Sequence, residues 1–182
     1  DWSDIATTTS NTSEFTSIIK TTGGLSVAQA TNLENTLDVV GDTTISGAMN
    51  ISGATFISGN TTIDGSLTLN DTLTLSGITV NGATTISNTL SVTGNTHLSG
   101  AANITGNTIV SGATTLSGAT VLHNTLSVAN VAVLASNLSV AGDLHLTGAT
   151  TISGAAIISG ATTITGATVM NNTLSVSGNV IA

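Results

Sequence analysis

The chain has 182 residues, with 20 glycines, no proline, no cysteine and one tryptophan, and only 5% of its residues are charged. Nine acidic residues against a single basic residue give a formal net charge of −8. This balance argues against nucleic acid and anionic membranes as partners, because almost nothing can neutralise phosphate groups, and no apolar run is long enough to insert across a membrane. The apolar residues are mostly aliphatic and the polar ones mostly Thr, Ser and Asn, which is typical of a repeat protein that buries many small, equivalent side chains.

The first 36 residues differ in sequence from the rest of the chain and are predicted to form an N-terminal cap or assembly segment. Asn11 to Glu14 fits a helix capping box. Phe15, Ile18 and Ile19 have helical spacing. We therefore expect a short helix in this segment.

A second helix could begin at Ser26, in the sequence "SVAQ". The aliphatic series described below can also be traced back through Leu33 and Val27, which would extend the repeat into this segment. Trp2 and Phe15 are two of the three aromatic residues of the chain. Bulky residues at one end of a repeat array are typical of a cap.

From residue 37 to residue 182 the sequence is built from six-residue units. Val, Ile, Leu or Met occupies every sixth position from Val39 to Val176, at 24 positions in all, with a contraction by one residue before Val80. Gly follows two residues later at 18 of these positions. The other six turn positions are Asp71, Asn88, Asn124, Asn130, Ser136 and Asn172. Because Gly, Asn and Asp tolerate positive φ best, one turn conformation of that kind is expected to recur in every unit.

The residues between two turns, such as 150–153, are predicted to form a short strand. Side chains alternate along a strand, so the aliphatic residue and the residue two positions before it should point inward. This second inward site holds Thr, Ala or Leu, as at Thr114, Ala156 and Leu174. Stacking of the units at about 4.8 Å per layer predicts an all-β fold, a single-chain parallel β-solenoid (β-helix) of hexapeptide-type repeats over residues 37–182.

Three modules of about 48 residues can be aligned along this solenoid, and they leave the coil length open. We favour a three-sided coil made of three six-residue units, because its core is easier to fill. The outward residue before each aliphatic position alternates from one unit to the next, however, which favours a two-sided coil of two units with one partly apolar face, or a coil of four units. The apolar members of this alternation are Ile109, Val121, Val133, Ile157 and Val169. Three chains interleaved in a trimer are a further alternative.

Runs such as "NTLSVTGNTHLSG" from Asn88, "TTISG" from Thr150 and "TTITG" from Thr162 resemble the shaft repeats of tail fibres and surface fibres in phages and large algal viruses. They are also similar to bacterial extracellular repeat proteins. The resemblance covers about residues 35–182. It implies a structural shaft, often trimeric, at a virion surface, at a cell surface or elsewhere outside the cell, which carries domains for adhesion that this chain lacks.

Few residues are candidates for catalysis or metal binding. His97 and His145 occupy equivalent, outward positions one module apart, while His123 stands elsewhere in the repeat. No second ligand has a suitable spacing from any of them. Asp42 and Asp64 lie in or beside turns, where Asp is common because of its local hydrogen bonds. We therefore expect a structural protein that is not an enzyme, with no catalytic residue, metal site or cofactor.

An outward ladder of hydroxyl groups supports ice binding as an alternative function. Thr115, Thr151, Thr163 and Thr165 would point outward from their strands, and such residues stacked on a flat face could order water. Residues such as Asn103 interrupt the pattern, and solvated strands favour Thr in any case. A fibre remains the preferred function.

We predict that copies of the chain associate end to end. The repeat stops at Ala182 without a cap, which would leave an open apolar core and unpaired backbone groups at the last coil. The predicted assembly residues are Trp2, Phe15, Ile18 and Ile19 at one end and Val176, Val180 and Ile181 at the other. The expected partner is another copy of the chain. Seven Asn-X-Ser/Thr sequences, including those at Asn50 and Asn103, would also allow glycans on Asn.

Overall fold

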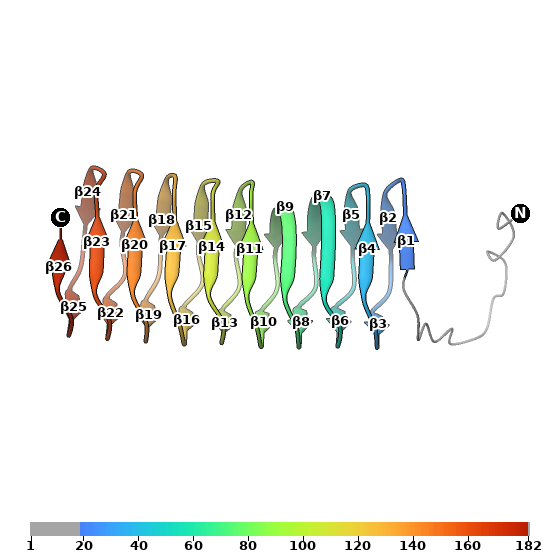
Figure 1. Cartoon of the computed structure of the whole chain (residues 1–182), viewed down its shortest axis with the longest axis horizontal. Coiled ribbons are helices and arrows are strands. Elements are labelled where there is room, and N and C mark those ends of the chain that lie inside the picture. The colour runs from blue at the N-terminus through green and yellow to red at the C-terminus, as the bar shows by residue number, and fades with distance from the viewer. Residues whose placement is uncertain (1–18, 182) are drawn as a thin grey trace, which may run out of the picture.

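The computed structural model describes residues 19–181, which form one stack of parallel strands wound into a solenoid of about nine turns (Figure 1). Each coil lies directly beside the next, about 18 residues further along the chain. Leu90 lies beside Thr108, for example, and Val92 beside Val110. The predicted parallel β-solenoid with three six-residue units in each three-sided coil is confirmed, and the alternatives of two and four units are wrong.

Three faces run along the stack, and each coil contributes one strand to each face. Face 1 is made of β1 (Ile19–Thr21), β4 (Leu37–Val39), the first halves of β7 (Thr55–Ile63) and β9 (Leu73–Val80), β11 (Leu90–Val92), β14 (Thr108–Val110), β17 (Leu126–Val128), β20 (Leu144–Leu146), β23 (Thr162–Ile164) and β26 (Val180–Ile181). Face 2 is made of β2 (Leu25–Val27), β5 (Thr43–Ile45), the second halves of β7 and β9, β12 (Thr96–Leu98), β15 (Thr114–Leu116), β18 (Ala132–Leu134), β21 (Thr150–Ile152) and β24 (Thr168–Met170). Face 3 is made of β3 (Thr31–Leu33), β6 (Met49–Ile51), β8 (Leu67–Leu69), β10 (Thr84–Ile86), β13 (Ala102–Ile104), β16 (Thr120–Leu122), β19 (Leu138–Val140), β22 (Ala156–Ile158) and β25 (Leu174–Val176).

The core is a set of aliphatic columns inside the three faces. Every aliphatic position of the six-residue series from Val39 to Ile164 is buried. From β4 to β23 the second inward position of each strand is buried as well, and it holds Thr, Ala, Leu, Ile or Met. Alternation along short strands therefore places two side chains of each unit inside and leaves the residue between them on the surface. Burial of each Leu or Ile contributes about 1.5–3 kcal/mol, so the columns are the main source of stability.

Glycine recurs at the corners because neighbouring coils approach closely there. No residue between 19 and 181 has a positive φ, so the expected positive-φ turn is wrong. A Cβ on Gly112 would instead lie 2.1 Å from the carbonyl oxygen of Gly94 in the preceding coil. A Cβ on Gly118 would lie 2.2 Å from the same atom of Gly100. A side chain on Gly112 or Gly118 would therefore overlap the backbone of the coil beside it.

Asn and Asp replace Gly at several corners and form a local hydrogen bond there. The side-chain oxygen accepts the N–H of the following residue at Asn35, Asp71, Asn88, Asn124, Asn130 and Asn172, with distances of 2.7–3.1 Å. An Asn or Asp that stands one position after the corner residue accepts a backbone N–H of the next coil instead. Asn95 binds the N–H of Ala113 at 3.0 Å, and Asn137 that of Ala155 at 3.0 Å. These side chains satisfy corner N–H groups that the strand ladders leave free.

The solenoid begins before the expected boundary at residue 37. β1 pairs with β4 in the same register as the later coils, with Ile19 beside Leu37. The helix expected from Ser26 is wrong, because Ser26 is the central residue of β2 and lies beside Thr44 of β5. The alternative, in which the repeat extends back through Val27 and Leu33, is confirmed. The capping box at 11–14 and its helix lie outside the described residues.

One coil is a residue shorter than the others, where the sequence contracts before Val80. Leu73 lies 18 residues after its partner Thr55, but Ile78 lies only 17 after Thr61. β7 and β9 run without a break through the corner between faces 1 and 2, and the register shifts between Ile57 and Asn60. Figure 1 shows both as long strands that pass over this edge of the stack, where the other coils have a turn.

Candidate functional site

The outward residues explain the alternation from one unit to the next. Two units are two thirds of a coil, so a residue type that recurs in every second unit moves to another face at each step and returns to the same face after two coils. Val121 and Ile157 accordingly lie on face 3 with Ser139 between them. Ile109 lies on face 1, and Val133 on face 2.

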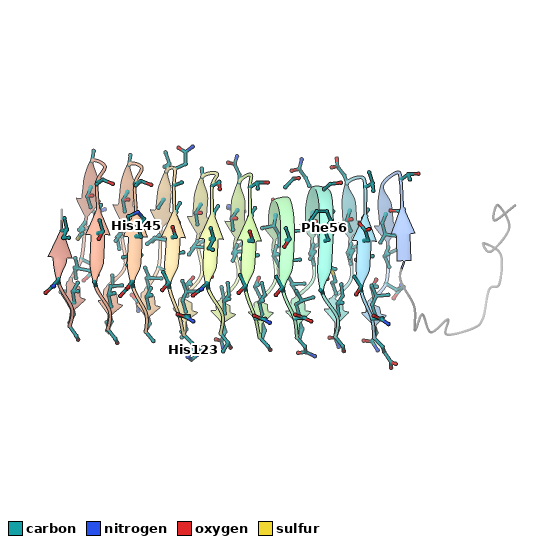
Figure 2. All side chains as sticks on the ribbon, viewed as in Figure 1. Phe56, His123 and His145 are labelled. Atoms are coloured by element: carbon teal, nitrogen blue, oxygen red, sulfur yellow. The ribbon has the colours of Figure 1, made fainter. Side chains whose placement is uncertain are left out.

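The exposed apolar residues therefore stand alone and do not form the continuous apolar face that a two-unit coil would give. On faces 2 and 3 they recur about 9.6 Å apart, twice the layer spacing, with Thr151 between Val133 and Val169 and Ser139 between Val121 and Ile157. On face 1, three layers separate Phe56 from Ile109. Figure 2 shows Phe56 and His145 on face 1, on separate coils, and His123 at the edge of face 3. A shallow apolar hollow on face 3 lies between Val121 and Ile157.

Face 2 carries the most regular set of hydroxyl groups. Its central outward positions, in register along the stack, are Ser26, Thr44, Thr62, Thr79, His97, Thr115, Val133, Thr151 and Val169. Of the residues expected for ice binding, Thr115 and Thr151 share this face two coils apart. Thr163 is half-buried on face 1 beside His145, and Thr165 is exposed just after that strand. The structure does not bring these four residues together.

The three histidines lie on three different faces. Nε2 of His97 is 3.1 Å from Oγ of Ser99 on face 2. Nε2 of His123 is 3.1 Å from Oδ1 of Asn103 on face 3. His145 is exposed on face 1. Between residues 19 and 181, no group of three or more His, Cys, Asp or Glu side chains could hold a metal ion.

The short coil leaves a hollow of about 340 Å³ at the corner between faces 1 and 2. It is lined by Asn60, Thr61, Thr62, Gly77, Ile78, Thr79, Gly94 and Asn95. In the regular coils one residue stands between the corner Gly and the next inward residue, and it fills this part of the corner. The short coil lacks that residue, because Ile78 follows Gly77 directly. The contraction before Val80 is visible in the sequence. A hollow could not be predicted from it, because the coil length and the corner that it affects were not known.

Charge is distributed very unevenly along the stack. Residues 72–181 contain one charged side chain, Asp143. Five acidic residues stand between residues 19 and 71, namely Glu34, Asp38, Asp42, Asp64 and Asp71. Most of the stack therefore has a neutral surface that is rich in Ser, Thr, Asn and Ala.

The expected assembly residues fall into two groups. Trp2, Phe15 and Ile18 lie outside the described residues, and Ile19 begins β1 at one end of the stack. At the other end Val176 is half-buried, while Val180 and Ile181 are 53% and 63% exposed. Val180 occupies an inward column position, which in the preceding coil is held by the buried Thr162.

Comparisons of the chain with protein-family models, with curated proteins and with solved structures gave no match. Within residues 19–181 there is no helix that could cross a membrane.

Proposed function

We propose that this protein is a structural subunit of a fibre or filament outside the cell or on a virion, in which the solenoid is the shaft. The observation that carries this proposal is the uniformity of the stack. The coils between residues 37 and 164 pair in the same register and bury the same two positions of each strand. The register differs only at the short coil. A repeat of this kind grows in one dimension as coils are added, without a change in cross-section.

The surface supports the same function. A neutral layer of hydroxyl and amide groups covers most of the stack, and it offers neither the charge that would hold phosphates nor clustered acids and bases. The fold and surface therefore suit a spacer better than a catalyst, and we keep the proposal that the chain is not an enzyme.

We further propose that copies of the chain associate end to end. In this arrangement the last coil of one copy stacks on a second copy. Met170 and Val180 are 37% and 53% exposed there, although the same inward columns are buried in the preceding coils. Stacking of a second solenoid would bury them and would pair the free edges of β24, β25 and β26.

The shaft is tested by adding coils. Duplication of residues 90–161 inserts four coils in register. Small-angle X-ray scattering should show a maximum dimension longer by about 19 Å, four layers of about 4.8 Å, with the same cross-sectional radius. Growth of the cross-section along with the length would contradict a shaft.

End-to-end association is tested separately by light scattering over a range of protein concentrations. The unmodified chain should form longer particles as concentration rises, and Met170→Lys with Val180→Lys should prevent this by placing charges in the junction. Ile109→Lys, on an exposed residue in the middle of face 1, is the control and should leave assembly unchanged. An unmodified chain that stays at one size would reject association and leave the shaft intact.

Ice binding remains the second candidate, because five Thr residues share the central outward row of face 2. They are Thr44, Thr62, Thr79, Thr115 and Thr151. Thermal hysteresis at millimolar protein is the decisive measurement. We expect any such effect to fall in Thr62→Leu with Thr79→Leu and to persist in Thr74→Leu, on face 1. Absence of hysteresis in the unmodified chain would dismiss this function.

A further inference from the structure

The corner hollow differs from the regular corners because the short coil has one residue fewer there. Asn60 precedes the gap and Asn95 follows it, while Gly77 forms the layer between them. Two layers of about 4.8 Å separate the positions of the two asparagines, so the gap is one coil high. The N–H of Ile78 donates to the carbonyl of Asn95 at 2.9 Å, so the short coil and the coil after it are joined beside the hollow as at the regular corners.

Polar groups converge on this hollow without partners of their own. Within the described residues, neither the amide of Asn60 nor the hydroxyls of Thr62 and Thr79 form a side-chain hydrogen bond. Asn95 uses its Oδ1 for the N–H of Ala113 at 3.0 Å and keeps its NH₂ group free. The hollow therefore offers two amides and two hydroxyls, which include both donors and acceptors.

The charge around the hollow decides the class of ligand. Its lining contains no ionisable side chain. The carboxylate of Asp42 accepts the backbone N–H of Asn60 at 2.8 Å and would repel an anion. A neutral ligand with many hydroxyl groups matches such a surface, because sugar hydroxyls both donate and accept hydrogen bonds. The volume of about 340 Å³ lies at the lower end of the range for small-molecule sites.

We propose that this hollow is a binding site for a neutral saccharide, which lies between Asn60 and Asn95 over Gly77. The site goes beyond the shaft function and does not depend on it. A site that is shallow and this polar should bind a single sugar ring weakly, with a dissociation constant on the order of 1 mM.

The experiment is a titration of the full chain with methyl α-mannoside, methyl α-glucoside and methyl N-acetyl-β-glucosaminide, followed by amide chemical shifts. At least one glycoside should shift the amides of Thr62, Gly77, Thr79 and Asn95 in a saturable manner. Shifts at none of these amides, or equal shifts along all three faces, would overturn the proposal.

Two variants fill the hollow by different routes. Insertion of Ala between Gly77 and Ile78 restores a coil of full length. Gly77→Val fills the floor, and the fold should tolerate it, because an added Cβ there meets the Oδ1 of Asn60 at 2.6 Å and no backbone atom closer than 3.4 Å. Both should abolish the shifts. Binding that survives in a folded filled variant would place the sugar elsewhere and reject the site.

Asn60→Ala removes one of the two amides and should weaken binding about five-fold or more. Asn107→Ala is the matched control. Asn107 also follows a corner Gly and accepts the N–H of Thr125 at 3.4 Å, but it stands at a regular corner. Equal weakening by the two variants would contradict a site at the short coil.

Discussion

At the scale of single residues, the corners of the solenoid show how a close approach selects an amino acid. Gly was predicted at these positions for its freedom to adopt positive φ, but at corners such as Gly112 and Gly118 it is needed because the adjacent coil leaves no room for a Cβ. The sequence pattern is the same for both causes. The two causes can be distinguished only from the distance between neighbouring coils, which a sequence pattern does not contain.

This cause predicts a large difference between two Gly-to-Ala changes in one corner column. Gly112→Ala should lower the free energy of unfolding by about 1–3 kcal/mol, since its Cβ would lie 2.1 Å from the Gly94 carbonyl oxygen. Gly23→Ala should be neutral or stabilise by up to about 1 kcal/mol, because no atom of residues 19–181 lies within 4 Å of a Cβ added there. Urea denaturation monitored by circular dichroism measures both. Equal effects would mean that the coils are not so closely stacked.

Buried threonines provide a second test at this scale. The hydroxyl of Thr114 is buried without a hydrogen-bond partner, whereas that of Thr120 donates to the Gly118 carbonyl at 3.3 Å. Thr114→Val should therefore raise the free energy of unfolding by about 1 kcal/mol, and Thr120→Val should lower it by about 0.5–1 kcal/mol. The same denaturation measurement compares them. A loss of stability in Thr114→Val would show that its hydroxyl is satisfied in solution.

At the scale of the strand and its turn, the six-residue unit made most of the fold predictable. Alternation fixed the inward residues, and every aliphatic position from Val39 to Ile164 is buried as expected. The N-terminal limit was harder, because the unit around Ser26 has Gln29 in place of the corner Gly and fits a helix locally. This segment forms a strand because it pairs with β5. A local sequence pattern could not predict that, since the pairing partner lies a full coil away.

The coil length predicts which deletions the fold accepts. Removal of residues 114–131, one full coil, should leave the β-sheet circular dichroism spectrum and cooperative unfolding intact, because all later strands keep their faces. Removal of residues 114–128 should unfold or aggregate the chain, since it breaks the six-residue phase and moves corner glycines into strands. Equal tolerance of the two deletions would contradict the registered stack.

At the scale of the whole molecule, the candidate sites depend on relations between coils. The expected ice-binding residues were selected by their sequence pattern alone, and the three-unit coil distributes them over two faces. The corner hollow arises from a missing residue whose effect appears only when the coils before and after it are stacked. Sequence reasoning therefore found the building unit but could not place the surface sites.

Because each coil contacts only its neighbours, stability should vary along the stack. Amide hydrogen exchange should be slowest in the central strands, β13 to β19, and fastest in β24, β25 and β26, which have one neighbouring coil. Mass spectrometry of peptides after exchange measures this gradient. If copies associate end to end, protection of β24 to β26 should rise with protein concentration, and a uniform rate along the chain would contradict the nearest-neighbour description.

The hydrogen bonds between coils lie along the axis of the stack, since they join strands that run across it. A pulling force applied to the two ends would load these bonds in line, and the solenoid would open from an end as one loop after another peels away. Each coil freed in this way would release roughly 60 Å of extended chain, about twelve times the height that it occupied. A shaft of the proposed kind would therefore resist bending and compression but give way under tension in steps, as an extensible tether does.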